Sequence, residues 1–172
     1  MKIKKTKFKD LLIIKGKTFK DQRGFLREII SEKLINKKFK FHITSKSKKN
    51  VIRGLHFQLK KPQGKFISII KGKVFDVVVD IRKNSKTFGK SFSIILSANN
   101  NKSLYIPPGF AHGFLTLDKE NIVCYSCTEY RSPGNEYAIS YKDPYLKINW
   151  PKKNPILSKK DKIAKKFKEI FK

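Results

Sequence analysis

The spacing of short apolar runs is the feature that most constrains the fold of this chain. Most runs alternate apolar and polar residues with a period of two, and Gly, Pro, Asn and Ser interrupt them at intervals of roughly 8–12 residues. Lys71-Gly72-Lys73 has the composition of a tight turn, and Pro107-Pro108-Gly109 that of a corner outside any central strand. The pattern therefore predicts an antiparallel sandwich or a jelly-roll barrel.

The period-two runs define the expected strands, and two further segments have helical character. The expected strands are 12–14, 40–44, 51–58, 65–71, 73–82, 90–96, 103–106, 113–117, 123–129 and 137–140. Helices are expected only at 27–34 and in the tail at 158–172. The tail has Ile163, Phe167, Ile170 and Phe171 on one stripe with Lys elsewhere, so an amphipathic helix is expected to dock on the barrel.

Length and apolar content favour a single domain over residues 1–172. The chain is 39% hydrophobic and contains 14 Phe and 6 Tyr, which is enough to fill a core. No apolar run approaches the roughly 20 residues that cross a bilayer. The apolar part of the N-terminus, 11–14, is too short for a signal peptide. With only two Cys in addition, a cytoplasmic location and no membrane partner are expected.

The formal net charge of +28 has two possible origins. It comes from 36 Lys and only 5 Arg, spread along the whole chain. A nucleic-acid surface is expected to concentrate charge on one face and to use Arg for bidentate contacts. A compositional bias toward Lys, Ile and Asn explains the even spread better, and no sequence-specific nucleic-acid binding is expected. A basic protein that binds polyanions without catalysis remains the alternative from a different class.

Several polar residues occupy positions where an all-β chain would place apolar ones. His56 interrupts the apolar strand 51–58, and Asp76 shares a face with Val74 and Val78. Burying a carboxylate on an inward face costs free energy unless the carboxylate is paired. Lys65, at the start of the expected strand 65–71, could reach the same end of the barrel. His112 follows the proline corner, and Tyr125 faces the same side of its strand as Cys127. Taken singly, each of these has an ordinary structural explanation: a packed His, a structural ion pair, a core Tyr.

The residues do not predict a metal site. Cys124 and Cys127 form a CxxC motif, but positions i and i+3 point to opposite faces of a strand, and no second pair exists. His56 and His112 could serve a metal-binding barrel, yet the clustered His-x-His arrangement is missing.

A set of sequence motifs occurs in order along the chain. These motifs are Asp21-Gln-Arg-Gly24, Arg53-Gly-Leu-His-Phe-Gln58, Gln63-Gly-Lys65, Gly72-Lys-Val-Phe-Asp-Val-Val-Val-Asp-Ile-Arg82, Ser85-Lys-Thr-Phe-Gly89, Ile106-Pro-Pro-Gly-Phe-Ala-His-Gly-Phe114, Asp143-Pro-Tyr-Leu-Lys-Ile-Asn-Trp-Pro151 and Ile156-Leu-Ser-Lys-Lys-Asp161. Together they make the chain similar to the dTDP-4-dehydrorhamnose 3,5-epimerase family. The resemblance covers about residues 10–162 and implies a metal-free, cofactor-independent isomerase with a cupin-type jelly-roll barrel. It also implies a nucleotide-sugar substrate and a place in dTDP-rhamnose and polysaccharide biosynthesis.

The resemblance implies an enolate mechanism that inverts C3 and C5 of a 4-keto-6-deoxy sugar nucleotide. His56 matches the base and Asp161 the carboxylate that orients it. A rival interpretation makes Asp161 part of a helix cap with Ser158. Lys65 matches the cation assigned to the enolate oxygen, and Tyr125 matches the acid on the opposite face. Asp76 is expected in an inner polar network with Lys65 or His56.

The resemblance further implies a set of substrate contacts and a shared site. The matching positions are Arg23, Glu28, Arg53, Lys65, His112, Glu136 and Lys160. Arg53 suits the diphosphate, because its fork can bind two oxygens. In the family the N-terminal segment with Arg23 and Glu28 reaches across a dimer interface, which implies a homodimer with sites built from two chains.

Three positions depart from the family pattern. Phe41 and Ile43 stand where the family usually has Gln-x-Asn, and Arg131 replaces a second tyrosine. These changes leave the base, acid and cation in place and alter the rim. Epimerisation at one carbon, or of another nucleotide sugar, is therefore the alternative function.

Overall fold

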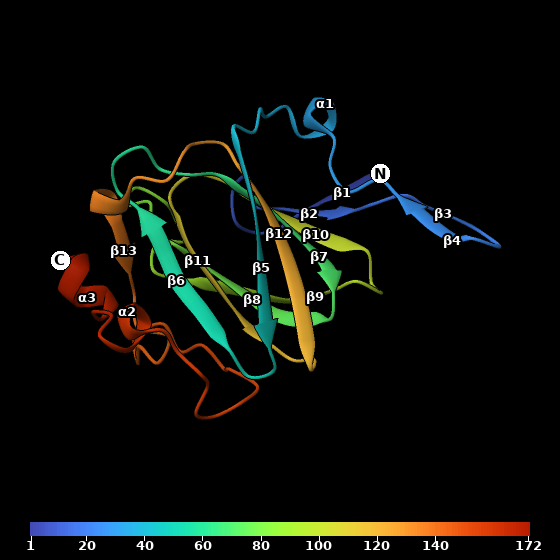
Figure 1. Ribbon diagram of the computed structural model, residues 1–172. Helices are drawn as coiled ribbons and strands as arrows, with labels where there is room; N and C mark the ends of the chain where they lie inside the picture. Colours follow the sequence, from blue (N-terminus) through green and yellow to red (C-terminus); the bar gives the residue numbers. More distant parts are fainter.

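Two stacked antiparallel sheets form the body of the protein in the computed structural model, which describes residues 1–172 (Figure 1). The six-stranded sheet has the order β1-β2-β10-β7-β12-β5, and the five-stranded sheet has the order β13-β6-β11-β8-β9. The strands are β1 (Lys2–Lys5), β2 (Leu12–Lys15), β3 (Thr18–Asp21), β4 (Gly24–Arg27), β5 (Phe41–Lys48), β6 (Ile52–Gln58), β7 (Lys65–Lys71), β8 (Lys73–Asp80), β9 (Ser91–Ser97), β10 (Lys102–Ile106), β11 (Phe110–Thr116), β12 (Glu120–Cys127) and β13 (Glu136–Ala138). The all-β prediction is confirmed.

The five-stranded sheet is buried on both of its faces. On its inner face, Val74 and Val78 pack with Ile67 and Leu104 of the opposite sheet in the main core. On its outer face, a second cluster is covered by the C-terminal segment; its buried members are Leu55, Phe57, Val77, Val79, Ile81, Ala111, Ile139, Leu146, Phe167 and Phe171. Alternate residues of a strand point to opposite faces of the sheet. The residues next to an outward-facing apolar residue therefore point into the space between the two sheets.

Strands β6 and β11 approach each other unusually closely. A Cβ atom on Gly54 would collide with the backbone of Gly113, and Gly54 has a φ of +127°. Only glycine tolerates both conditions. The two strands can therefore approach closely at Gly54 and Gly113.

The predicted strand at 65–71 has the bounds of β7, whereas the N-terminal region differs from prediction. A helix was expected at 27–34, but Arg27 is the last residue of β4, and the helix α1 covers only Glu32–Ile35. The strands β1, β3 and β4 were not predicted. The hairpin projects from the body (Figure 1) and leaves Phe25 and Leu26 exposed, so burial does not impose the alternation that reveals strands elsewhere.

The C-terminal tail is not the single amphipathic helix that was predicted. It forms two short helices, α2 (Lys159–Lys162) and α3 (Phe167–Ile170), separated by a bridge between Lys165 and Ile139. Phe167 is buried, but Ile163 is 83% exposed, so the predicted stripe is wrong at that position. No helix of the chain is both long enough and apolar enough to span a membrane.

Candidate active site

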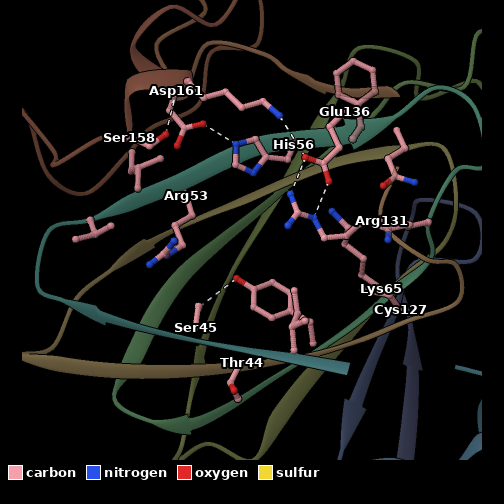
Figure 2. A pocket seen from close by; sticks show the side chains of 18 of the residues that line it. Thr44, Ser45, Arg53, His56, Lys65, Cys127, Arg131, Glu136, Ser158 and Asp161 are labelled. Carbon is pink, nitrogen blue, oxygen red and sulfur yellow. Dashed lines mark hydrogen bonds and ion pairs between the residues drawn. The ribbon is translucent and has the colours of Figure 1, made fainter. Parts of the chain in front are cut away.

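A pocket of about 600 Å³ opens between the two sheets and is closed on one side by the C-terminal segment (Figure 2). Its walls come from β5, β12 and β7 of one sheet, from β6 and β13 of the other, and from the segment that leads into α2. The residues singled out from the sequence that line it are Phe41, Ile43, Arg53, His56, Lys65, Tyr125, Cys127, Arg131, Glu136, Ser158, Lys160 and Asp161.

His56 and Asp161 form a short hydrogen-bonded pair on the β6 side of the pocket. The imidazole Nε2 lies 2.5 Å from Oδ1 of Asp161. The His56 side chain is 37% exposed, whereas that of Asp161 is 2% exposed. Burial alone would raise the pKa of Asp161, but the hydrogen bond and charge of His56, with further hydrogen bonds from Ser158 and the Gly54 backbone, outweigh it and lower the pKa. The carboxylate is therefore ionised and accepts a hydrogen bond from Nε2–H.

The two rival roles predicted for Asp161 use different atoms and occur together. The Ser158 hydroxyl accepts a hydrogen bond from the Asp161 backbone N–H at 3.1 Å, which caps α2. The cap uses the backbone N–H of Asp161, so the carboxylate can accept the hydrogen bond from His56. The cap thus fixes the backbone from which the carboxylate reaches the imidazole.

Tyr125 lies on the opposite sheet from His56. In the sheet register it pairs with Ile43 on β5 and with Ile67 on β7, so apolar residues flank it on both sides. Its hydroxyl lies 3.4 Å from the Ser45 hydroxyl. Burial raises the pKa of Tyr125 well above its ordinary value. The phenol therefore keeps its proton at neutral pH and can donate it.

Ser45 was not predicted as a site residue. The expected strand ended at position 44, whereas β5 continues to Lys48. The period-two alternation through Phe41 and Ile43 continues to Ser45, and extending that pattern by one step would have placed its hydroxyl in the pocket.

Lys65 enters the pocket from the first position of β7, beside Cys127 of β12. Burial lowers the pKa of Lys65, while the charges of neighbouring groups act in the opposite direction. None of the ion pairs of the chain includes Lys65. Its ammonium is therefore free to bind an oxygen of a ligand.

Asp76 pairs with His112, and not with Lys65 or His56 as the sequence suggested. His112 Nε2 lies 2.9 Å from Asp76 Oδ2, and both side chains are almost completely buried. His112 sits opposite His56 in the β11–β6 register, yet it does not line the pocket. The hydrogen bond depends on β11 lying between β6 and β8, an order that the sequence pattern does not reveal.

The pocket rim carries cations on opposite sides (Figure 2). Arg53 donates through Nε to Ser47 Oγ at 3.0 Å and through Nη2 to the Lys46 carbonyl at 3.3 Å, which leaves Nη1 of its guanidinium without a partner. Across the pocket, Arg131 makes two hydrogen bonds to Glu136, at 2.9 and 3.0 Å. Lys160 approaches the same carboxylate at 3.4 Å. Hydrogen bonding by Arg131 holds the pKa of Glu136 below its ordinary value.

Arg23 and Glu28 do not line this pocket. Arg23 lies at the tip of the projecting hairpin, where its side chain is 85% exposed and pairs with Asp21. Glu28 follows the hairpin, 3.9 Å from the N-terminal amine. A single chain therefore does not bring these two residues together with the other predicted substrate contacts.

Comparison with known proteins identifies the family. A sequence model of the family described as dTDP-4-dehydrorhamnose 3,5-epimerase matches residues 5–169. The chain belongs to this family. The dTDP-4-dehydrorhamnose 3,5-epimerase of Salmonella typhimurium is 47% identical over 93% of this chain and 92% of the relative.

Solved structures agree with this membership and with the predicted cupin-type fold. The Legionella pneumophila enzyme, in complex with dTDP-4-keto-L-rhamnose, superposes with a TM-score of 0.92 at 42% identity, over 96% of this chain and 92% of that one. A more distant structure is ChmJ of Streptomyces bikiniensis, a 3'-monoepimerase in complex with dTDP-quinovose. It superposes with a TM-score of 0.87 at 25% identity, over 94% of this chain and 85% of that one.

Proposed function

We propose that this epimerase inverts C3 and C5 of dTDP-4-dehydro-6-deoxyglucose and thereby forms dTDP-4-dehydrorhamnose. The observation that carries the proposal is the placement of His56 and Tyr125 on opposite sheets of one pocket. Inversion requires a base on one face of the sugar carbon and an acid on the other. The carbons on either side of the C4 ketone are the positions at which proton loss gives a stabilised enolate.

The hydrogen bond to Asp161 selects the basic atom of His56. Because Nε2–H donates to the ionised carboxylate, the lone pair that can accept a proton lies on Nδ1. When Nδ1 takes the proton from C3 or C5, the imidazolium is stabilised by the neighbouring negative charge. Asp161 is thus a positioning residue that fixes the tautomer and orientation of the base.

Lys65 and Tyr125 complete the proton transfer. As the C–H bond breaks, its electron pair moves into the enolate, and negative charge develops on the C4 oxygen. The Lys65 ammonium, which has no partner within the protein, is suited to stabilise that oxygen. Tyr125 then donates its phenolic proton to the carbon from the opposite face, and the configuration is inverted.

The diphosphate and nucleoside are assigned to the cationic rim. Arg53 can donate from Nη1, which has no partner within the chain, and Lys160 also lines the pocket. The dTDP moiety is proposed because the Legionella relative is bound to dTDP-4-keto-L-rhamnose. No protein-bound cofactor enters the proposed reaction.

We also propose a homodimer in which the β3–β4 hairpin of one chain completes the site of the other. The hairpin projects from the body and exposes Phe25 and Leu26, at 63% and 70%. Exposed apolar side chains of this kind are typical of association surfaces. This arrangement would bring Arg23 and Glu28 to a pocket that they do not reach in their own chain. A cytoplasmic location and a role in polysaccharide biosynthesis belong to the same proposal.

Epimerisation at one carbon is the second candidate function. Three pocket residues that depart from the family pattern favour it. Phe41, Ile43 and Arg131, which replace polar or aromatic residues usual in the family, all line the pocket. ChmJ shows that this fold also supports a 3'-monoepimerase.

The two candidates are separated by incubating the protein with dTDP-4-dehydro-6-deoxyglucose and determining the product configuration at each carbon by NMR. Inversion at C3 and C5 supports the 3,5-epimerase. Inversion at C3 alone would establish the second candidate. An unchanged substrate, with the homologous Salmonella enzyme active in the same buffer, would contradict both.

A further inference from the structure

Arg131 is held at the pocket by two hydrogen bonds to a single carboxylate. Its Nε donates to Glu136 Oε1 at 2.9 Å, and its Nη2 donates to Glu136 Oε2 at 3.0 Å. This bidentate geometry fixes the plane of the guanidinium. Nη1 has no hydrogen-bond partner in the chain, and the Arg131 side chain is 57% exposed. A donor in a fixed position is therefore open to a ligand.

The backbone on both sides of Arg131 is held by the side chain of Gln58. Gln58 is the last residue of β6 and is only 6% exposed. Its Oε1 accepts a hydrogen bond from the Ser132 N–H at 3.0 Å, and its Nε2 donates to the Tyr130 carbonyl at 3.4 Å. Gln58 is also the partner of Glu136 in the β13–β6 register. One buried amide thus fixes the residues before and after Arg131, beside the strand that carries its carboxylate partner.

Arg131 lies at the end of the pocket away from Arg53. Arg53, His56 and Gln58 follow one another along β6, and all three line the pocket. Because a strand advances about 3.3 Å per residue, His56 lies between the other two along the pocket wall. Figure 2 shows Arg131 and Lys65 on the same side of His56, away from Arg53. The pocket therefore has one cation at one end, the base in the middle, and Arg131 and Lys65 at the other end.

This order sets the direction of a bound sugar. The proposed function, on which this inference rests, assigns the diphosphate to Arg53 and proton removal from C3 and C5 to His56. In a pyranose ring C4 is opposite C1, the carbon that carries the diphosphate. With C1 toward Arg53, the C4 oxygen, the C3 hydroxyl and the C6 methyl point toward the other end. Lys65 is assigned to the C4 oxygen, and a methyl group accepts no hydrogen bond, so the C3 hydroxyl is the acceptor that remains for Arg131.

We propose that Arg131 is a specificity-determining residue that donates from Nη1 to the C3 hydroxyl of the sugar, and that Gln58 is the positioning residue that holds it there. A hydrogen bond from a charged donor is stronger than one between neutral groups. A sugar without the C3 hydroxyl leaves Nη1 without a partner, so the pocket should select sugars that carry it. The tyrosine that is usual in the family at this position would offer one neutral hydroxyl instead.

Binding of two unreactive sugar nucleotides tests the proposal independently of the epimerase assay. dTDP-glucose and dTDP-3-deoxyglucose lack the C4 ketone, and they differ from each other only in the C3 hydroxyl. Isothermal titration calorimetry of the full-length protein should show that dTDP-glucose binds about tenfold or more tightly than the deoxy compound. Arg131→Met keeps an unbranched apolar side chain and removes every donor. It should abolish the difference by weakening dTDP-glucose binding alone.

Two further variants make this result specific. Lys40→Met removes a cation that pairs with Glu129 at 3.0 Å, two residues before Arg131, but that does not line the pocket; the difference between the two nucleotides should remain. Gln58→Met keeps the length of the side chain and removes its hydrogen bonds to the backbone, so the difference should shrink. If Gln58→Met is poorly folded, Gln58→Glu replaces it, because the carboxylate keeps the acceptor and loses the donor.

Each outcome bears on one assignment. Equal affinities of the wild type for the two nucleotides, or an unchanged difference in Arg131→Met, would overturn the assignment of Arg131. An unchanged difference in the folded Gln58 variant would overturn the positioning role of Gln58. A protein that shows the predicted difference but does not epimerise its substrate would contradict the proposed function and leave the assignment of Arg131 standing.

Discussion

The imidazole of His56 and the carboxylate of Asp161 are 2.5 Å apart, although 105 residues separate them in the chain. His56 is part of a central strand, whereas Asp161 arrives on a short helix of the C-terminal segment. The base of the proposed reaction therefore belongs to the five-stranded sheet, and the group that orients it belongs to a segment that must dock on that sheet.

Removing the Asp161 carboxylate should impair chemistry more than stability. Asp161→Asn keeps the backbone N–H that Ser158 accepts, so α2 should remain capped. The amide cannot stabilise the imidazolium, and proton abstraction should slow by about 10²-fold or more. Steady-state kinetics checks this, with Ser158→Ala as the control. That change should cost about 1 kcal/mol in stability and leave most of the activity; equal activity losses in both variants would argue that Asp161 acts only through the cap.

Tyr125→Phe should separate proton exchange from inversion. The variant keeps the ring and its packing and loses only the transferable proton. His56 should still exchange the substrate protons with solvent, whereas inverted product should nearly disappear. NMR of a single sample in D₂O reports both quantities. A packing role for Tyr125 predicts normal turnover instead, and Ser45→Ala, which removes only the partner of the phenol, should retain inversion.

The docking of the tail should control the activity of the dyad. Phe167 is 1% exposed, and its ring lies 4.9 Å from that of Phe171 and 5.3 Å from those of Phe88 and Tyr145. Phe167→Ala should destabilise the protein by about 3–5 kcal/mol and lower kcat, because the segment that carries Asp161 loosens. Ile163→Ala, at an 83% exposed position of the same segment, is the matched control and should change neither quantity. A Phe167→Ala protein with full activity would show that the dyad does not depend on this anchor.

The loss of folding stability at acidic pH should depend on Asp80. Burial would raise its pKa, but hydrogen bonds from Arg82, Ser85 and Thr87 lower it from 3.8 to about 2. Because the folded-state pKa is the lower one, this contribution is present above pH 3.8 and is lost as the pH falls toward 2. The shift corresponds to about 2 kcal/mol.

Urea unfolding as a function of pH tests this assignment. Asp80→Asn should lower stability at pH 7 and flatten its dependence between pH 4 and 2. Asp21→Asn, which removes an exposed ion pair with Arg23, should have no such effect. A steep acid dependence that survives in Asp80→Asn would assign the acid limit to other carboxylates.

The parts of the fold that could be predicted are those in which burial imposes a pattern. The strand at Lys65–Lys71 was predicted with its bounds, since its neighbours bury it. The β3–β4 hairpin was missed because Phe25 and Leu26 face solvent, and the tail was predicted as one helix because a helical stripe does not reveal a break at Lys165. The spacing of apolar residues along the sequence does not show where an exposed hairpin turns or where the docked C-terminal tail bends.

The candidate site shows the same division. Family motifs placed His56, Lys65, Tyr125 and Asp161 together, and the structure places all four on one pocket. The pairing of Asp76 with His112 was not predicted, because it depends on strand order. Only the folded chain shows which inward-facing polar groups are adjacent.

The assignment of His56 as the base is tested by solvent deuterium incorporation into dTDP-4-dehydro-6-deoxyglucose, followed at C3–H and C5–H by NMR for the wild type and for His56→Ala. Exchange is expected at both carbons in the wild type, with a loss of about 10³-fold at both in the folded variant, because one base removes each proton. Exchange at a near-normal rate in folded His56→Ala would contradict the assignment of His56 as the base and, with it, the mechanism proposed for this pocket.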